Sequence, residues 1–138
     1  MILMDTGPIA ALFNPADSAH KKCIRVLEPI KEPVSTTIPV LAEAFHLMHA
    51  INPGTIGLMD FINNRGLQVL DLDRPSLTRC FELMVKYADR AMDFADASLV
   101  AMAEKHQSRT IFTLDRNDFS TYRIRKGHRH LTFEVIGC

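Results

Sequence analysis

Short apolar segments alternate with segments of helical periodicity along the whole chain, and this alternation is the feature that most limits its fold. Residues 1–4 are apolar at every position, as expected for a strand that is covered on both faces. Further short strands are predicted at residues 33–36, 67–72, 110–114 and 131–136, with helices between them. Strands that alternate with helices predict an α/β fold, in which helices flank a parallel sheet.

The length and charge of the chain narrow the possibilities further. Its 138 residues fit one domain with one core. Sixteen acidic and sixteen basic residues cancel, so a polyanion would have to bind to a local basic patch. Three cysteines, far apart in the sequence, match neither a disulfide framework nor a zinc site, and this indicates a reducing cytoplasm. We expect neither a membrane-spanning segment nor a signal peptide, because Asp5 interrupts the apolar start.

Four acidic residues are placed so that they would meet at one edge of such a sheet. Asp5 follows the first strand and Asp115 follows the strand at residues 110–114. The carboxyl ends of parallel strands form the edge where ligands bind in open α/β sheets. Glu43 has apolar neighbours in a predicted helix at residues 40–50, and Asp96 begins an otherwise apolar helix, where an unpaired buried carboxylate is costly. We expect Asp5, Glu43, Asp96 and Asp115 to converge.

Each of these acids also has a purely structural interpretation. Asp5 fits the N-cap position of the next helix. Asp93 and Asp96 have the spacing of an N-cap and the third helical residue, which also places them on one helix face. Asp115 and Asp118 fit a turn, because aspartate bonds its own backbone. These interpretations remain open for each acid taken alone, whereas the whole set favours a shared site.

Converging carboxylates call for a cation. Two carboxylates about 5 Å apart repel by roughly 3 kcal/mol at an effective dielectric constant near 20, so four of them bind either protons or cations. An all-oxygen ligand set suits Mg²⁺, with Mn²⁺ as a substitute. His46 and His49 follow Glu43 at successive three-residue steps, as in metal-binding helix bundles, but no matching motif exists elsewhere in the sequence. We expect both histidines to have a surface or packing role.

Four motifs together resemble the PIN domain ribonucleases, in particular the VapC-type toxins of toxin–antitoxin pairs. The first runs Asp-Thr-Gly-Pro-Ile-Ala-Ala-Leu from Asp5, and the second is Val-Leu-Ala-Glu ending at Glu43. Asp96-Ala97 opens an alanine-rich helix, and the last motif is Thr113-x-Asp115-x-x-Asp118-Phe119. The resemblance spans nearly the whole chain, and the order and spacing of four separated acids are more specific than any single motif.

This resemblance implies a single PIN domain over residues 1–138, with a three-layer α/β/α sandwich and a central, mainly parallel sheet. It also implies a Mg²⁺-dependent endoribonuclease in the cytoplasm, a homodimer, and a small DNA-binding antitoxin as partner. The alternative is a catalytically weak or inactive PIN domain that serves as an RNA-binding or protein-interaction module. The residues carried over are the metal-binding and catalytic Asp5, Glu43, Asp96 and Asp115, the additional acids Asp93 and Asp118, and the substrate-positioning Thr6 and Thr113.

Two other α/β classes fit less well, and one segment stays open. A receiver domain needs a second acid beside Asp5 and a lysine near the last strand, and a haloacid-dehalogenase-like phosphatase needs an aspartate at position 7, which is glycine. Residues 122–130 are basic and polar, and they are interpreted either as a solvated loop or as a site of RNA contact.

Overall fold

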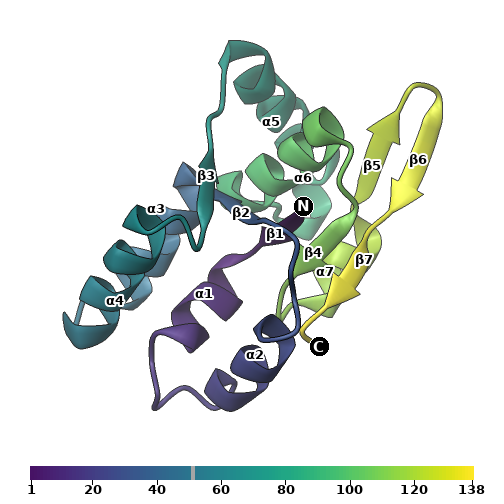
Figure 1. The fold of residues 1–138 in the computed structure, drawn as a ribbon. Helices are drawn as coiled ribbons and strands as arrows, with labels where there is room; N and C mark the ends of the chain where they lie inside the picture. The colour runs from purple at the N-terminus through teal and green to yellow at the C-terminus, as the bar shows by residue number, and fades with distance from the viewer. Residues whose placement is uncertain (51) are drawn as a thin grey trace.

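The computed structural model describes residues 1–50 and 52–138, and within them a five-stranded parallel sheet forms the centre of the molecule (Figure 1). The strand order is β3-β2-β1-β4-β7, and all four neighbouring pairs are parallel. The strands are β1 (Ile2–Met4), β2 (Val34–Thr37), β3 (Gln68–Leu70), β4 (Thr110–Phe112) and β7 (Glu134–Ile136). Every residue of the central strand β1 is buried, which explains its uninterrupted apolar sequence.

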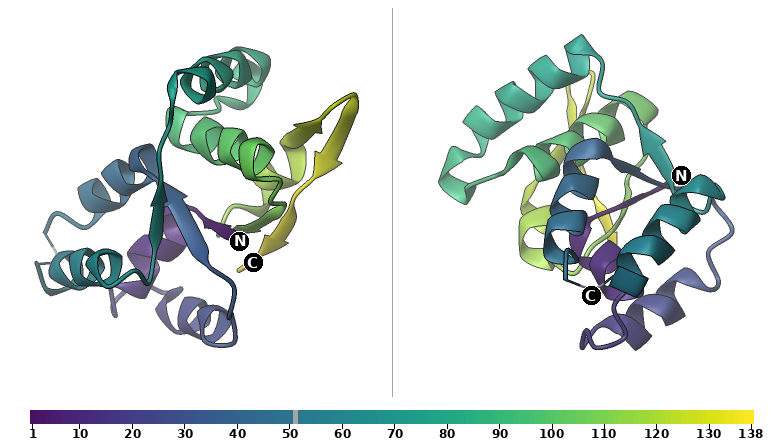
Figure 2. Two further views of the ribbon diagram at one scale, coloured as in Figure 1. Left: turned by 45° about the horizontal axis from the view of Figure 1, so that its top comes forward. Right: turned by 90° about the vertical axis from the view of Figure 1, so that its left-hand side faces the viewer.

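Helices cover both faces of this sheet. Figure 2 shows α5 and α6 on one side and α1, α2 and α4 on the other. The predicted three-layer α/β/α sandwich with a central parallel sheet is confirmed. The helices are α1 (Thr6–Leu12), α2 (His20–Leu27), α3 (Ile38–Leu47), α4 (Asn52–Asn63), α5 (Arg74–Lys86), α6 (Phe94–His106) and α7 (Arg116–Thr121), with a short 3₁₀ helix, η1 (Ala88–Arg90).

The helix α6 is the most deeply buried of these elements. It packs against α5, α3 and β5, and residues 97–103 are buried without interruption. A helix that is apolar on all sides needs such a central position. Its first turn, which carries half-buried Asp96, is more exposed than this central part.

The C-terminal part of the chain differs from the sequence prediction. The basic segment is not a loop, because β5 (Arg123–Lys126) and β6 (Arg129–Thr132) form an antiparallel hairpin with Gly127 at φ +60° in its turn. The single strand predicted at residues 131–136 is also wrong. Buried Phe133 separates β6 from β7, so the chain leaves the hairpin and joins the main sheet there.

Several predicted boundaries shift by a few residues. The strand predicted at residues 110–114 ends at Phe112. The helix α4 begins at Asn52 and has Pro53 in its first turn, where proline is tolerated. The helix α2 begins after Ala19, which makes no side-chain cap, although the chain before it is turned by a hydrogen bond from the Ala19 amide to Asp17. In the described part of the chain, no helix is both long and apolar enough to cross a membrane.

Candidate active site

Asp5 lies at the carboxyl edge of the sheet, between β1 and β4. Its amide donates to the carbonyl of Phe112 at 2.9 Å, which continues the pairing of the two strands. Its carboxylate accepts from the Thr6 amide at 2.8 Å and from the Thr113 hydroxyl at 2.7 Å. The N-cap interpretation is thus confirmed for Asp5. Capping does not exclude a second role for Asp5, because its carboxylate is also held by Thr113, the residue that follows β4.

Glu43 reaches the same edge from α3. Its carboxylate is half-buried and accepts a hydrogen bond of 3.2 Å from the Thr6 hydroxyl, directly beside Asp5. Burial raises the pKa of Glu43, and the nearby carboxylates of Asp93 and Asp5 raise it further. Thr6 and Thr113, which the resemblance placed beside the site, each donate to one of its acids.

Asp96 stands in the first turn of α6, and three neighbours determine its position. Asp93 is the N-cap of this helix and accepts from the Asp96 amide at 2.8 Å. The hydroxyl of Tyr122 donates to Asp96 Oδ2 at 2.9 Å. Burial, followed by the charges of Asp5 and Asp93, raises the pKa of Asp96 to about 8. Asp5 and Asp96, which are far apart in the sequence, therefore repel each other in the folded protein.

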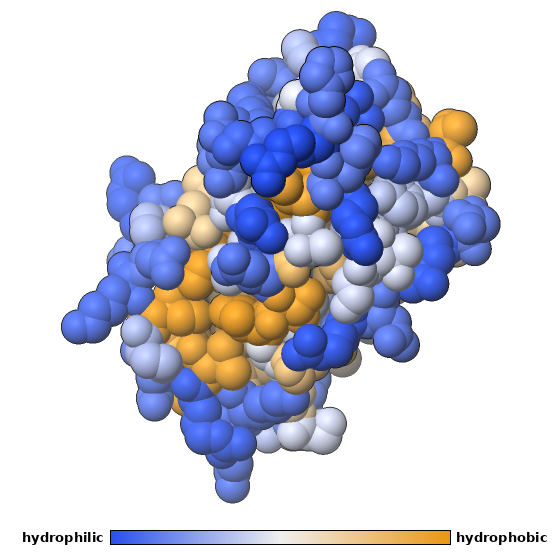
Figure 3. Space-filling model, turned by 90° about the vertical axis from the view of Figure 1, so that its right-hand side faces the viewer, coloured by the Kyte–Doolittle hydropathy of each residue, from blue (hydrophilic) through white to orange (hydrophobic). Residues whose placement is uncertain are grey.

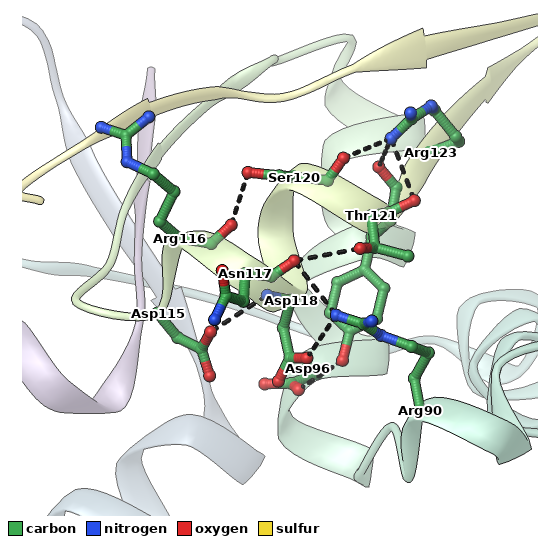
Figure 4. A network of polar contacts seen from close by, with 10 residues as sticks. Arg90, Asp96, Asp115, Arg116, Asn117, Asp118, Ser120, Thr121 and Arg123 are labelled. Atoms are coloured by element: carbon green, nitrogen blue, oxygen red, sulfur yellow. Dashed lines mark hydrogen bonds and ion pairs between the residues drawn. The ribbon is translucent and has the colours of Figure 1, made fainter.

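Asp115 and Asp118 complete the edge where the chain enters α7 (Figure 4). Asp115 is the N-cap of this helix and accepts from the Asp118 amide at 3.0 Å, while its own amide donates to the Thr113 hydroxyl at 3.0 Å. Arg90 forms an ion pair of 3.2 Å with Asp118. Burial and the Asp115 carboxylate raise the pKa of Asp118, and Arg90 acts in the opposite direction. Asp115 thus has a structural role, as the N-cap of a helix rather than as the turn former that its sequence context suggested.

These acids influence one another as a group, which we call the acid cluster. Desolvation is the main reason that the pKa of Asp5 is raised, and the charges of Asp93 and Asp115 add to it. Asp5 also repels Glu43 and Asp96, and Asp118 repels Asp96. Such repulsion is relieved by protons or by a cation. The members of the acid cluster are Asp5, Glu43, Asp93, Asp96, Asp115 and Asp118.

The donor chemistry of the acid cluster fits a hard divalent cation. All of its side-chain donors are oxygen atoms, the ligand type of Mg²⁺ and Mn²⁺. Among residues 1–50 and 52–138, no three aspartate, glutamate, histidine or cysteine side chains are already arranged closely enough to hold a metal ion. Mg²⁺ does not need such a cage, because it usually keeps several waters and takes only one or two carboxylates from the protein.

Two site residues escaped the sequence analysis. Tyr122 contacts Asp96 across 26 positions in sequence, and Arg90 contacts Asp118 across 28, so no local pattern connects either pair. His46 on α3 and His49 just after this helix are exposed, in line with the expected surface role, and the ring of His49 contacts the carbonyl of His46 at 2.8 Å.

Comparisons with known proteins agree with this architecture. A family model for the PIN domain matches residues 2–124. Ribonuclease VapC26 of Mycobacterium tuberculosis is 25% identical over 138 residues, which cover 98% of this chain and 99% of that protein.

Solved structures share the fold at lower identity. The crystal structure of Mycobacterium tuberculosis VapC20, described as a Sarcin-Ricin loop cleaving toxin, superposes with a TM-score of 0.77 at 21% identity and covers 85% of this chain and 92% of its own. A toxin–antitoxin complex from Klebsiella pneumoniae gives a TM-score of 0.68 at 16% identity, covering 88% and 92%. Since the family model spans most of the sequence, the chain belongs to the PIN domain family.

Proposed function

We propose that this chain is a metal-dependent endoribonuclease of the VapC toxin type, which hydrolyses RNA phosphodiester bonds with the help of Mg²⁺. The observation that carries the proposal is the acid cluster at the carboxyl edge of the sheet, in which the charge of Asp5 raises the pKa of partly buried Asp96, and the charges of Asp93 and Asp115 raise that of deeply placed Asp5. Like charges held together in this way are a mark of functional sites. The relative VapC26 is a ribonuclease, which supports the same activity for this chain.

In the proposed mechanism Asp5 and Asp96 hold the ion, and Glu43 and Asp115 complete its site. Bound Mg²⁺ would supply a water of lowered pKa as nucleophile and would stabilise the charge that develops on the phosphate. The protein's own contribution is the orientation of the acids. Thr113 fixes Asp5, Thr6 fixes Glu43 and Tyr122 fixes Asp96, each through a hydroxyl donor.

The proposal extends to partners. Structures with the same fold include a toxin–antitoxin complex from Klebsiella pneumoniae and VapBC2 from Rickettsia felis bound to a promoter DNA fragment. We therefore infer a small DNA-binding antitoxin, a homodimer and a cytoplasmic location. An open groove of about 440 Å³ beside Glu43, lined by Ala42, His46 and Leu47, and exposed apolar side chains on α3 offer a surface for such contacts.

Cleavage of a mixed set of structured and unstructured RNAs tests the activity directly. Purified protein is expected to cut RNA in the presence of Mg²⁺, to lose this activity with a chelator, and to regain it when Mg²⁺ or Mn²⁺ is added back. Cleavage that persists in chelator would contradict the metal-dependent mechanism. RNA binding without cleavage under every metal condition would favour a module that binds RNA and has lost catalysis.

A further inference from the structure

The hairpin β5–β6 carries the densest run of positive charge in the sequence. Residues 123–132 contain four of the sixteen lysine and arginine residues and none of the sixteen acidic ones, although the whole chain is neutral. Arg125, Lys126 and Arg129 are exposed, and in the described part of the chain none of them forms an ion pair with an acidic side chain. Figure 3 looks onto the side of the molecule that carries the hairpin, and the upper part of this face is largely hydrophilic, with an apolar area below it.

The pairing of the two strands brings like charges together. Lys126 lies directly opposite Arg129. Like charges in opposite positions of an antiparallel pair are destabilising. Charged side chains on an exposed edge strand also prevent two sheets from pairing edge to edge. Charges of either sign have this effect, and a mixture of signs would avoid the repulsion between Lys126 and Arg129. A surface that carries one sign only is suited to an anionic partner.

The hairpin is directly attached to the acid cluster. Tyr122, the residue before β5, contacts Asp96 near the start of α6, and the Arg125 amide donates at 2.8 Å to Glu104 near the end of the same helix. The strand therefore runs along α6 and away from the acid cluster. Arg125 lies three residues beyond Tyr122, roughly 10 Å along an extended strand. Buried Ile124 and its partner Leu131 hold the hairpin against the fold, while the cations remain outside.

We propose that the hairpin binds the phosphate backbone of the RNA strand whose scissile bond lies at the acid cluster. This inference rests on the proposed endoribonuclease function. The acid cluster by itself repels a polyanion, and Arg90 beside it is already paired with Asp118. The cations of the hairpin, a short distance from the acid cluster along β5, offset this repulsion by binding the phosphates that flank the scissile bond. Their contacts are electrostatic and carry no base preference, because phosphate contacts position a nucleic acid without reading its sequence.

The salt dependence of RNA binding tests this surface. The variant Arg125→Gln/Lys126→Gln/Arg129→Gln removes three cations and keeps polar side chains. Lys21→Gln/Lys22→Gln/Arg25→Gln removes three exposed cations from α2 and is its matched control. Affinity for a fluorescein-labelled single-stranded RNA of mixed sequence is measured by anisotropy in chelator, where cleavage is not required, over a range of salt concentrations. Thermal melting and circular dichroism confirm that both variants are folded.

The hairpin variant is expected to lower the slope of log affinity against log salt by about 2, since each phosphate contact contributes about 0.7 for a single strand. The α2 variant is expected to keep the wild-type slope. Unchanged binding by the hairpin variant, or an equal loss in both variants, would overturn the proposal. If the hairpin variant lost affinity for polyglutamate but kept its affinity for RNA, the proposal would also be overturned. The partner of the hairpin would then be an acidic protein segment.

The same measurements separate this inference from the activity on which it rests. A protein that binds RNA through the hairpin but cuts no RNA with Mg²⁺ would contradict only the proposed nuclease function. A protein that cuts RNA while the hairpin variant keeps its salt slope would contradict only the proposed surface. If both hold, the single substitution Lys126→Gln should lower the slope by about one third of the effect of the triple variant, because the contacts are independent.

Discussion

The hydroxyl of Tyr122 donates a hydrogen bond of 2.9 Å to Asp96 Oδ2, and this contact joins the acid cluster to the base of the basic hairpin. Tyr122 is fully buried, with its ring edge-on to Tyr87 and Phe119 at centroid distances of 5.1 Å and 5.2 Å. Burial and the neighbouring Asp96 raise the pKa of Tyr122, so its hydroxyl stays protonated and remains a donor. Among the hydrogen bonds of the described residues, this is the one that the carboxylate of Asp96 accepts from outside its own helix.

Tyr122→Phe should reduce cleavage at neutral pH by about ten- to a hundredfold, because a hydrogen bond to a carboxylate that carries its charge when Mg²⁺ is bound contributes about 1.5–3 kcal/mol. The ring packing is kept, so the fold should persist. Steady-state cleavage and the Mg²⁺ concentration that gives half-maximal activity report the effect. Tyr87→Phe is the matched control, since the Tyr87 hydroxyl accepts from the Arg123 amide and the structure records no bond from it to Asp96. Equal losses in both variants would point to a general packing effect.

The metal-free protein should become less stable as the pH rises, because Asp96 is protonated in the folded state and loses this proton at high pH. Its pKa is raised from 3.8 to about 8 in the folded state, so between these values the folded protein holds a proton that the unfolded chain has released. The free energy of unfolding then falls with increasing pH. Thermal melting in chelator from about pH 5 to about pH 8 should show this decline, and Asp96→Asn, which cannot ionise, should flatten it. If the melting temperature depended on pH equally in both proteins, the raised pKa of Asp96 would be contradicted.

Asp5→Asn should abolish Mg²⁺-dependent cleavage while leaving the protein folded. The substitution removes a charge from a buried site where burial and the charges of Asp93 and Asp115 disfavour it, so the metal-free variant should be no less stable than the wild type. A saturating ligand that binds only the folded state stabilises it by about 2.7 kcal/mol at a hundred times its dissociation constant. Mg²⁺ should therefore raise the melting temperature of the wild type and have little effect on Asp5→Asn. Full activity in this variant would remove Asp5 from the mechanism.

The alternation of strands and helices was sufficient to predict the layers and the parallel sheet, because a strand such as β1 that is apolar on both faces needs helices on both sides. The same logic placed Asp5 and Asp115 after parallel strands. The sequence could not decide whether one acid can both cap a helix and belong to a cluster. In the structure Asp5, Asp93 and Asp115 are helix N-caps, and the charges of Asp93 and Asp115 also raise the pKa of Asp5.

The hairpin was missed for a different physical reason. Each of its strands has one apolar residue, Ile124 and Leu131, so neither shows the alternation that marks a half-buried strand. Their cross-strand pairing and the contact of β5 with α6 supply the missing stabilisation, and the contact with α6 is a long-range feature. Tyr122 and Arg90 were missed because each meets its partner acid only in the folded chain.

Thr113→Val should weaken both stability and cleavage, because this buried hydroxyl connects two members of the acid cluster. It donates to Asp5 at 2.7 Å and accepts from the Asp115 amide at 3.0 Å. Valine keeps the shape and the strand preference of threonine but leaves the Asp115 amide without this acceptor, which should cost about 1–3 kcal/mol in the free energy of unfolding. Urea denaturation measures that loss, and cleavage should fall with it even where the variant is fully folded.

Thr110→Val in β4, the strand that leads to Thr113, is the matched control for this substitution. Its hydroxyl makes a 3.4 Å contact with exposed Glu134, at the opposite end of β4 from the acid cluster. Surface substitutions of this kind usually change stability by no more than about 0.5 kcal/mol. If Thr113→Val behaved like Thr110→Val in both measurements, the Thr113 hydroxyl would have no part in holding Asp5 and Asp115 in place. A loss of cleavage in Thr113→Val alone would show that orienting these two carboxylates contributes to catalysis.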